Sequence, residues 1–188
     1  GGNSKLSVQG EIPKANGDSL TVTFNHWDLS NFDALTKNTG INFDGFINGI
    51  FEVSIFKDSP TIVSDLTIDK FGLNDVLLGK ARLINTWNNI DNSVFVKVQI
   101  IRKGNAGTGK IFSLDGFYYP FKGDSSLRLT ADFNRINIEF LNPFLSDLFH
   151  GIEGKGKGHL NISGTPAKPV IEGKAVLDRA SLIVNYLN

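Results

Sequence analysis

The residue types that most often do chemistry at neutral pH are sparse in this chain. It has three histidines, His26, His150 and His159, and no cysteine. No two histidines have the HxxxH spacing of a zinc site, so we predict no metal centre and no thiolate chemistry. The segment GNAGTGK (104–110) is faintly similar to a phosphate-binding loop. The alternating segment IFSLDGFYY follows it instead of a helix, which argues against nucleotide binding.

Carboxylates, the other common catalytic groups, are scattered. The pattern places none of them in the interior; they are Asp28, Asp33, Asp65, Asp69, Asp115 and Asp178. A glycosidase needs two carboxylates a few ångströms apart. Nothing in the sequence singles out such a pair, although it does not exclude one. No GxSxG nucleophile motif is present either. We therefore predict a protein that is not an enzyme and uses no cofactor.

Composition is typical of a folded protein. The 188 residues are 40% hydrophobic and 20% charged, with a formal net charge of zero. Lysine and arginine are spread along the chain, which argues against a nucleic-acid partner, since that needs a basic stripe. No apolar run reaches the roughly 18–20 residues that span a bilayer. Fifteen Phe beside 20 Gly suit many strands joined by tight turns.

The chain repeats itself. Residues 49–64 and 158–173 align, an offset of 109, and identities persist without a gap from 20 to 78. Identical pairs include Phe24/Phe133, Gly49/Gly158, Pro60/Pro169 and Asp69/Asp178. Upstream the offset becomes 106. We predict one elongated β domain over 1–188, with a first module at about 5–110 and a partial second module at about 111–188.

Strict alternation of apolar and polar residues predicts the elements. Short links between alternating runs imply a long antiparallel meander of about fourteen strands with one apolar face. Leu77, Ala81 and Leu83 belong to that face, and the strand phase stays open near 71–79 and 101–111. One segment breaks the pattern: Asn142 as N-cap and Pro143 predict a short helix or turn near 142–150.

Such a meander must close, stack or curl. A repeat that continues past barrel size favours a sheet curled into a U-shaped trough with an apolar groove. Glycines at apolar-facing positions, such as Gly49 and Gly158, allow strands to bend. A packed sandwich core is the competing interpretation. The predicted groove lining comprises Phe24, Phe51, Val53, Leu66, Ile68, Val96, Val98, Leu114, Phe133, Leu160, Ile162 and Ile171.

The segment GKGKGHLNISGTPAKPVIEGKAVLDRASLIVNYLN (154–188) resembles the C-terminal region of the TamB family, the translocation and assembly module of the bacterial envelope. The residues that match the family's sequence motif are Gly158, Leu160, Ile162, Gly164, Thr165, Pro169, Ile171, Gly173, Ala175 and Leu177. The preceding segment FLNPFLSDLFHGIEGKGKG (140–158) is also similar to the family's sequence just before this motif. The resemblance is specific over about 133–188 and looser in the first module. The frequent use of Asn, Lys and Phe is similar to that of family members from Bacteroidetes.

The resemblance implies a curled sheet called a β-taco, with an apolar groove. It implies the periplasm of a Gram-negative bacterium and a parent protein anchored in the inner membrane by a helix outside this sequence. The expected protein partner is an outer-membrane protein of the Omp85 or TamA type. The roles implied are outer-membrane protein assembly and, through AsmA-like relatives, glycerophospholipid transfer.

Three functional hypotheses follow. A lipid conduit would hold phospholipid acyl chains in the groove. A chaperone would pair nascent outer-membrane strands with a free sheet edge. A structural scaffold or adhesin would have a fully packed interior.

Overall fold

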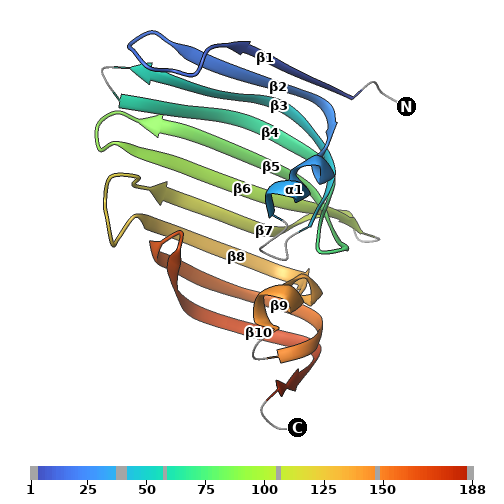
Figure 1. The fold of residues 1–188 in the computed structure, drawn as a ribbon. Helices are drawn as coiled ribbons and strands as arrows, with labels where there is room; N and C mark the ends of the chain where they lie inside the picture. The colour runs from blue at the N-terminus through green and yellow to red at the C-terminus, as the bar shows by residue number, and fades with distance from the viewer. Residues whose placement is uncertain (1–3, 37–41, 57–58, 105–106, 147–148, 186–188) are drawn as a thin grey trace.

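In the computed structural model, the chain forms one antiparallel sheet of ten strands in sequence order, β1 to β10 (Figure 1). The structure describes residues 4–36, 42–56, 59–104, 107–146 and 149–185. The strands are β1 (Lys5–Gly10), β2 (Ser19–Asp28), β3 (Phe43–Phe56), β4 (Ser59–Leu73), β5 (Val76–Asn88), β6 (Ser93–Gly104), β7 (Gly107–Tyr118), β8 (Leu127–Asn137), β9 (Phe149–Thr165) and β10 (Lys168–Val184). The sheet curls without closing into a barrel, as predicted for a trough.

The strands are fewer and longer than expected. Several phase shifts in the alternation are β-bulges inside strands, and the sequence pattern misread them as strand ends. In β2 the pairing shifts between Phe24 and Trp27, and in β4 between Ile68 and Phe71. A bulge adds one unpaired residue, so the alternation slips while the strand continues. The same effect explains which residues near 71–79 face the core, a point that the sequence left undetermined. Leu78 is buried, whereas Leu77, expected on the apolar face, is 62% exposed.

Bulges recur at the spacing of the sequence repeat. His26 and Arg135, 109 residues apart, have φ angles of 50° and 52°, and Lys70 and Arg179 have 55° and 50°. Each of the four lies at a register shift of its strand. Bulged residues with left-handed φ bend a strand and increase its twist. The division into two modules remains a prediction, but these backbone bends repeat with its period.

Two helical segments interrupt the meander, and both lie over the same side of the sheet (Figure 1). The first is η1 (Leu29–Phe32) with α1 (Asp33–Thr36), and the second is η2 (Glu139–Leu141) with α2 (Asn142–Leu145). The second segment is shorter than predicted, because the chain is already in β9 at Phe149. Asn142 is the first residue of α2, so the predicted N-cap role is wrong; Leu141 is the N-cap.

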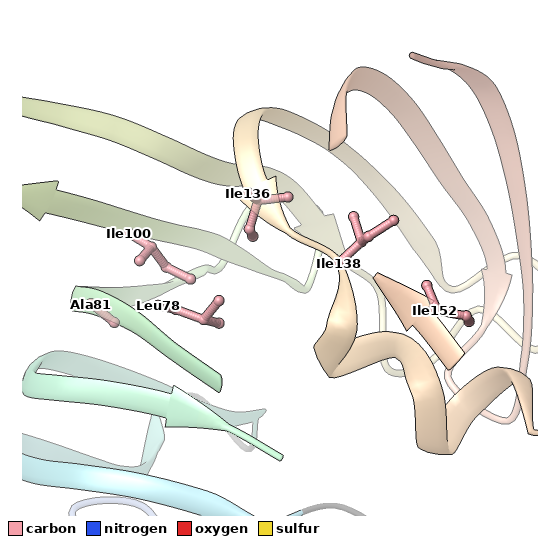
Figure 2. Close-up of a cluster of buried hydrophobic side chains, with 6 residues drawn as sticks. All are labelled: Leu78, Ala81, Ile100, Ile136, Ile138 and Ile152. Carbon is pink, nitrogen blue, oxygen red and sulfur yellow. The ribbon is translucent and has the colours of Figure 1, made fainter. Parts of the chain in front are cut away.

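Two clusters of buried side chains lie on this side of the sheet. The first joins Leu29 of the η1 segment to Ile47 and Leu66 on β3 and β4. The second is drawn in Figure 2 and joins strands that are not neighbours. It brings Leu78, Ala81 and Ile100 of β5 and β6 against Ile136, Ile138 and Ile152 of β8, the start of η2 and β9. The curl of the sheet therefore brings β5 and β6 against β8 and β9.

Candidate functional site: an apolar concave face

Cross-strand register places apolar residues in continuous rows on the side of the sheet that carries η1 and η2. Residues paired directly across antiparallel strands project from the same face. One row runs Leu6, Phe24, Gly49, Leu66, Leu83, Val98, Leu114, Ala131, Leu160, Gly173. The next runs Trp27, Ile47, Ile68, Ala81, Ile100, Phe112, Phe133, Gly158, Ala175. Neither row contains a polar side chain apart from the indole N–H of Trp27.

A third row runs Val8, Val22, Phe51, Ser64, Asn85, Val96, Gly116, Leu129, Ile162, Ile171, and a shorter one pairs Leu20, Val53 and Ile62. All twelve residues predicted to line the groove therefore lie on one face. Their exposure differs: Leu66 is buried, Ile171 on the terminal strand β10 is 59% exposed, and the other ten are half-buried. We call this surface the concave face.

A cavity of about 310 Å³ lies on the concave face of the first module. Its lining is entirely apolar and comes from the η1 segment and from β3 to β6: Leu29, Phe32, Phe43, Ile47, Leu66, Ile68, Phe71, Ala81, Leu83 and Val98. Three of the predicted lining residues, Leu66, Ile68 and Val98, take part. The volume is at the lower end of the range of about 300–1,000 Å³ found for small-ligand sites. A site without polar groups suits a hydrocarbon better than a polar metabolite.

The helical segment beside this cavity is held by side-chain hydrogen bonds. Asp28 Oδ1 accepts from the backbone N–H of Ser30 at 3.0 Å and caps η1. Asp33 Oδ1 accepts from the backbone N–H of Phe43 at 2.9 Å, which ties the segment to the first residue of β3. These bonds keep Leu29 and Phe32 on the concave face.

The second module repeats both bonds 109 residues later. Asn137 Oδ1 accepts from the Glu139 N–H at 3.0 Å, and Asn142 Oδ1 accepts from the Ile152 N–H at 2.8 Å. Asp and Asn serve equally as the acceptor in these bonds, because each offers a side-chain oxygen to a backbone donor. We call an Asp or Asn side chain that binds a backbone N–H in this way an Asx clip. In the sequence these clips are visible only as Asp or Asn at matching places in the repeat.

The concave face is not open along its whole length. Leu78 is 2% exposed and packs among Ile136, Ile138 and Ile152 (Figure 2). Asn74, in the turn between β4 and β5, donates from Nδ2 to the carbonyl of Phe140 in η2 at 3.0 Å. The η2 segment therefore packs on the concave face against the cluster around Leu78 and against the β4–β5 turn.

Sequence patterns missed a polar break in the apolar rows. Ser64 and Asn85 are paired in the third row, and Trp87 lies two residues beyond Asn85 on the same face. Ser64 Oγ, Asn85 Oδ1 and Trp87 Nε1 are buried and have no hydrogen-bond partner within the described residues. Ser64 sits at an apolar-phase position between Ile62 and Leu66, which is the only sequence signal.

The opposite face carries most of the charged side chains, although it also holds Ile50, Ile84, Phe95 and Phe117. One of its rows runs Asn48, Thr67, Arg82, Gln99, Ser113, Asp132, His159, Lys174. Arg82 Nη2 and Nε bind Asp65 Oδ2 and Oδ1 at 2.8 and 3.1 Å, and these bonds lower the pKa of Asp65 and raise that of Arg82. Lys80 pairs with Asp69 at 2.9 Å. These groups are solvent-exposed, so they mark the water side of the sheet.

The histidines take part in separate local contacts. His26 stacks on Phe46 at 4.2 Å between ring centroids, His150 contacts Asn185, and His159 Nδ1 lies 2.8 Å from Asp132 Oδ1. Within the described ranges, no three His, Cys, Asp or Glu residues gather as metal ligands. The described part of the chain also has no helix with the length and apolarity needed to cross a bilayer.

The glycine-rich segment 104–110 joins two strands. Gly104 ends β6 and pairs with Gly107 at the start of β7, with 105–106 outside the described residues. The segment is a β-hairpin connection, and no helix N-terminus follows it to bind a phosphate.

Comparison with protein-family models, curated proteins and solved structures finds no match to this chain. The resemblance to the TamB family thus remains a prediction that depends on the glycine and apolar motif of 133–188.

Proposed function

We propose that the concave face binds the acyl chains of phospholipids and that the protein transfers lipid between the inner and outer membranes of a bacterial envelope. The observation that carries this proposal is the set of apolar rows crossing all the strands, together with the all-apolar cavity of about 310 Å³. Apolar surface that stays accessible in an open pocket is more typical of a binding site than of a purely structural face.

Energetics favour passive transfer. Removing a methylene from water is worth about 0.8 kcal/mol, so an acyl chain does not cross water unaided. A groove lined by Leu, Ile, Val and Phe offers a chain surroundings similar to the bilayer interior. The lipid would move with little net change in free energy while its headgroup stays in water. In this proposal the protein acts in the periplasm with an outer-membrane partner of the Omp85 or TamA type.

Neighbouring residues of β6 provide the test. Val96 lies on the concave face, and Lys97 projects from the opposite face next to it. A photo-crosslinking amino acid at Val96 should capture acyl chains of lipid bound to the purified protein, and the same group at Lys97 should not. Val96→Glu should slow lipid transfer between donor and acceptor vesicles at least tenfold, with Lys97→Glu near wild type.

Thermal unfolding by circular dichroism shows whether Val96→Glu remains folded. Should that variant unfold, the crosslinking pair alone decides. Equal lipid capture at both positions, or none at either, would contradict acyl binding on the concave face.

The exposure of β10 favours a second function, the binding of client β-strands. Apart from Val184, the whole strand is exposed, including Val170, Val176 and Ile183 at 50, 69 and 48%. Among the described residues β10 pairs only with β9, and an unpaired strand edge with apolar side chains is suited to adding an antiparallel strand. The client would be a nascent outer-membrane β-strand, whose alternation matches that of the sheet.

Crosslinking from β10 distinguishes the two functions. A photo-crosslinker at Val176 should capture an alternating β-barrel peptide if β10 is a chaperone edge. Capture of lipid alone at Val96, with no peptide at Val176, would exclude the second function.

A further inference from the structure

The sheet divides between β7 and β8. These strands pair from Tyr118–Leu127 to Phe112–Phe133, where their ladder ends within the described residues. Beyond that point β7 stays with β6 as far as Gly107–Gly104, and β8 stays with β9 as far as Asn137–Lys155. The β6–β7 hairpin and the end of β8 therefore separate (Figure 1). We call this opening the fork.

Cations from four strands meet in the fork. Arg102, Lys110, Arg135 and Lys155 line a cleft of about 670 Å³, and the described lining contains no Asp or Glu. This concentration stands out because the chain as a whole has a formal net charge of zero. A cleft lined by one sign of charge raises the local concentration of the opposite ion.

The cations are available to a ligand. Arg102 is oriented by two backbone carbonyls, since Nε donates to Leu78 at 2.9 Å and Nη2 to Leu77 at 2.6 Å, which leaves its charge unpaired. Lys110, Arg135 and Lys155 are exposed, and none is ion-paired within the described part of the chain. Two carboxylates lie next to this group: Glu139 and Asp178 line a smaller cavity of about 180 Å³ together with Arg135 and Lys155. Asp178 is the cross-strand partner of Lys155 in the β9–β10 ladder but, in the described structure, is not ion-paired with it.

A pocket of about 660 Å³, whose surface is mainly apolar although charged side chains also line it, adjoins the cleft and shares Lys110, Ile111 and Asn134 with it. Its lining adds Phe112 and Phe133 at the apex of the fork and Val176 of β10. The polar side chains of Lys157, His159 and Lys174 also line it. Residues of both faces line this pocket, since Phe112 and Phe133 belong to a concave row and Ser113 and Asp132 to a polar row. Asp132 lines the pocket and not the cleft, and its Oδ1 lies 2.8 Å from His159 Nδ1.

We propose that the fork binds an acidic glycerophospholipid, with its phosphate among Arg102, Lys110, Arg135 and Lys155 and its acyl chain against Ile111, Phe112 and Phe133. The cations complement a net negative headgroup, and the adjoining pocket complements hydrocarbon, so the two cavities together match an amphiphile. The inference rests on the proposed lipid function and deepens it by naming headgroup charge and a place where lipid contacts the sheet from the side.

The experiment compares two lysolipids with the same acyl chain, lysophosphatidylglycerol and lysophosphatidylcholine, kept below micelle-forming concentrations. Calorimetry on the intact chain should show about tenfold tighter binding of the anionic lipid, because several partly exposed ion pairs act together. The preference should weaken as salt rises from about 0.05 to 0.5 M.

Charge reversal locates the site. Lys110→Glu/Lys155→Glu should remove the preference for the anionic lipid and leave lysophosphatidylcholine binding unchanged. Lys5→Glu/Lys14→Glu makes the same change in net charge near β1, on exposed residues far along the sheet, and should keep the preference. Inorganic phosphate alone should bind far more weakly than the anionic lysolipid.

Each outcome decides between the proposals. Equal binding of both lysolipids to the wild type overturns the fork proposal and leaves the concave-face function standing. If both double variants lose the preference for the anionic lysolipid, the net charge of the protein explains the preference, and the fork proposal is again overturned. Phosphate competing as tightly as the lipid would identify a free-anion site. Binding of neither lysolipid would contradict the proposed function itself.

Discussion

The side-chain oxygen of Asn142 accepts a hydrogen bond from the backbone N–H of Ile152 at 2.8 Å, while Asn142 Nδ2 donates to the carbonyl of the same residue at 3.0 Å. One amide thus satisfies both backbone groups at the point where β9 crosses the η2–α2 segment. Ile152 is only 3% exposed, so water does not easily replace either bond.

Removing this clip should destabilise the fold. Asn142→Ala leaves the Ile152 N–H and C=O without partners, and we expect a loss of about 1–3 kcal/mol in the free energy of unfolding. Urea unfolding measures it. Asn142→Asp keeps the acceptor, as Asp33 does in the first module, and should lose less. An alanine variant as stable as wild type would show that the clip contributes nothing.

Leu78 should carry much of the contact of β5 and β6 with β8 and β9. It is 2% exposed at the centre of the buried cluster, whereas its neighbour Leu77 is 62% exposed. Leu78→Ala leaves a cavity that its surroundings cannot fill, and we expect a loss of about 2–5 kcal/mol. Leu77→Ala is the matched control and should change stability by less than about 0.5 kcal/mol. Similar losses for both would contradict the buried packing.

Close approach between strands should make Gly49 irreplaceable. Its φ is 124°, and an added Cβ would lie 2.1 Å from the carbonyl oxygen of Asp65 on β4. Gly49→Ala therefore combines backbone strain with a clash, and we expect a loss above about 3 kcal/mol. Gly17 has a φ of 92° with nothing within 4 Å of that position, so Gly17→Ala reports strain alone at about 1 kcal/mol. Equal decreases in melting temperature for Gly49→Ala and Gly17→Ala would refute the clash.

The Asp65–Arg82 pair should make stability depend on acid pH. Hydrogen bonds from Arg82 lower the pKa of Asp65 in the folded chain. A lowered folded pKa means that the contribution is fully present above the ordinary Asp value of about 4 and is lost as pH falls through the folded value. Asp65→Asn should therefore be less stable than wild type at neutral pH, with the difference vanishing in acid. Chemical unfolding at several pH values tests this, and a gap independent of pH would exclude the pair as its source.

Local patterning determined the sheet and its faces. Alternation selected the same twelve residues that the register later placed on the concave face, because side chains of a strand point to opposite sides at every step. Left-handed bends and Asx clips recur at the offset of 109, although the sequence pattern predicted neither feature. The pattern could not foresee that phase slips were bulges, since a bulge and a strand end look alike when only alternation is visible. Leu77 was misassigned for that reason.

Only the tertiary structure decided how the faces are used. Leu78 meets Ile138 across the trough because the sheet curls, and a curl depends on the sum of bends in many strands. Arg102, Lys110, Arg135 and Lys155 are separated along the chain and read as a dispersed charge pattern. They meet because the β7–β8 ladder ends at Phe112–Phe133 and lets two pairs of strands diverge. The sequence thus determined which residues face inward, through a local two-residue period, and long-range strand pairing determined which of them are buried, which line open volume and where charge gathers.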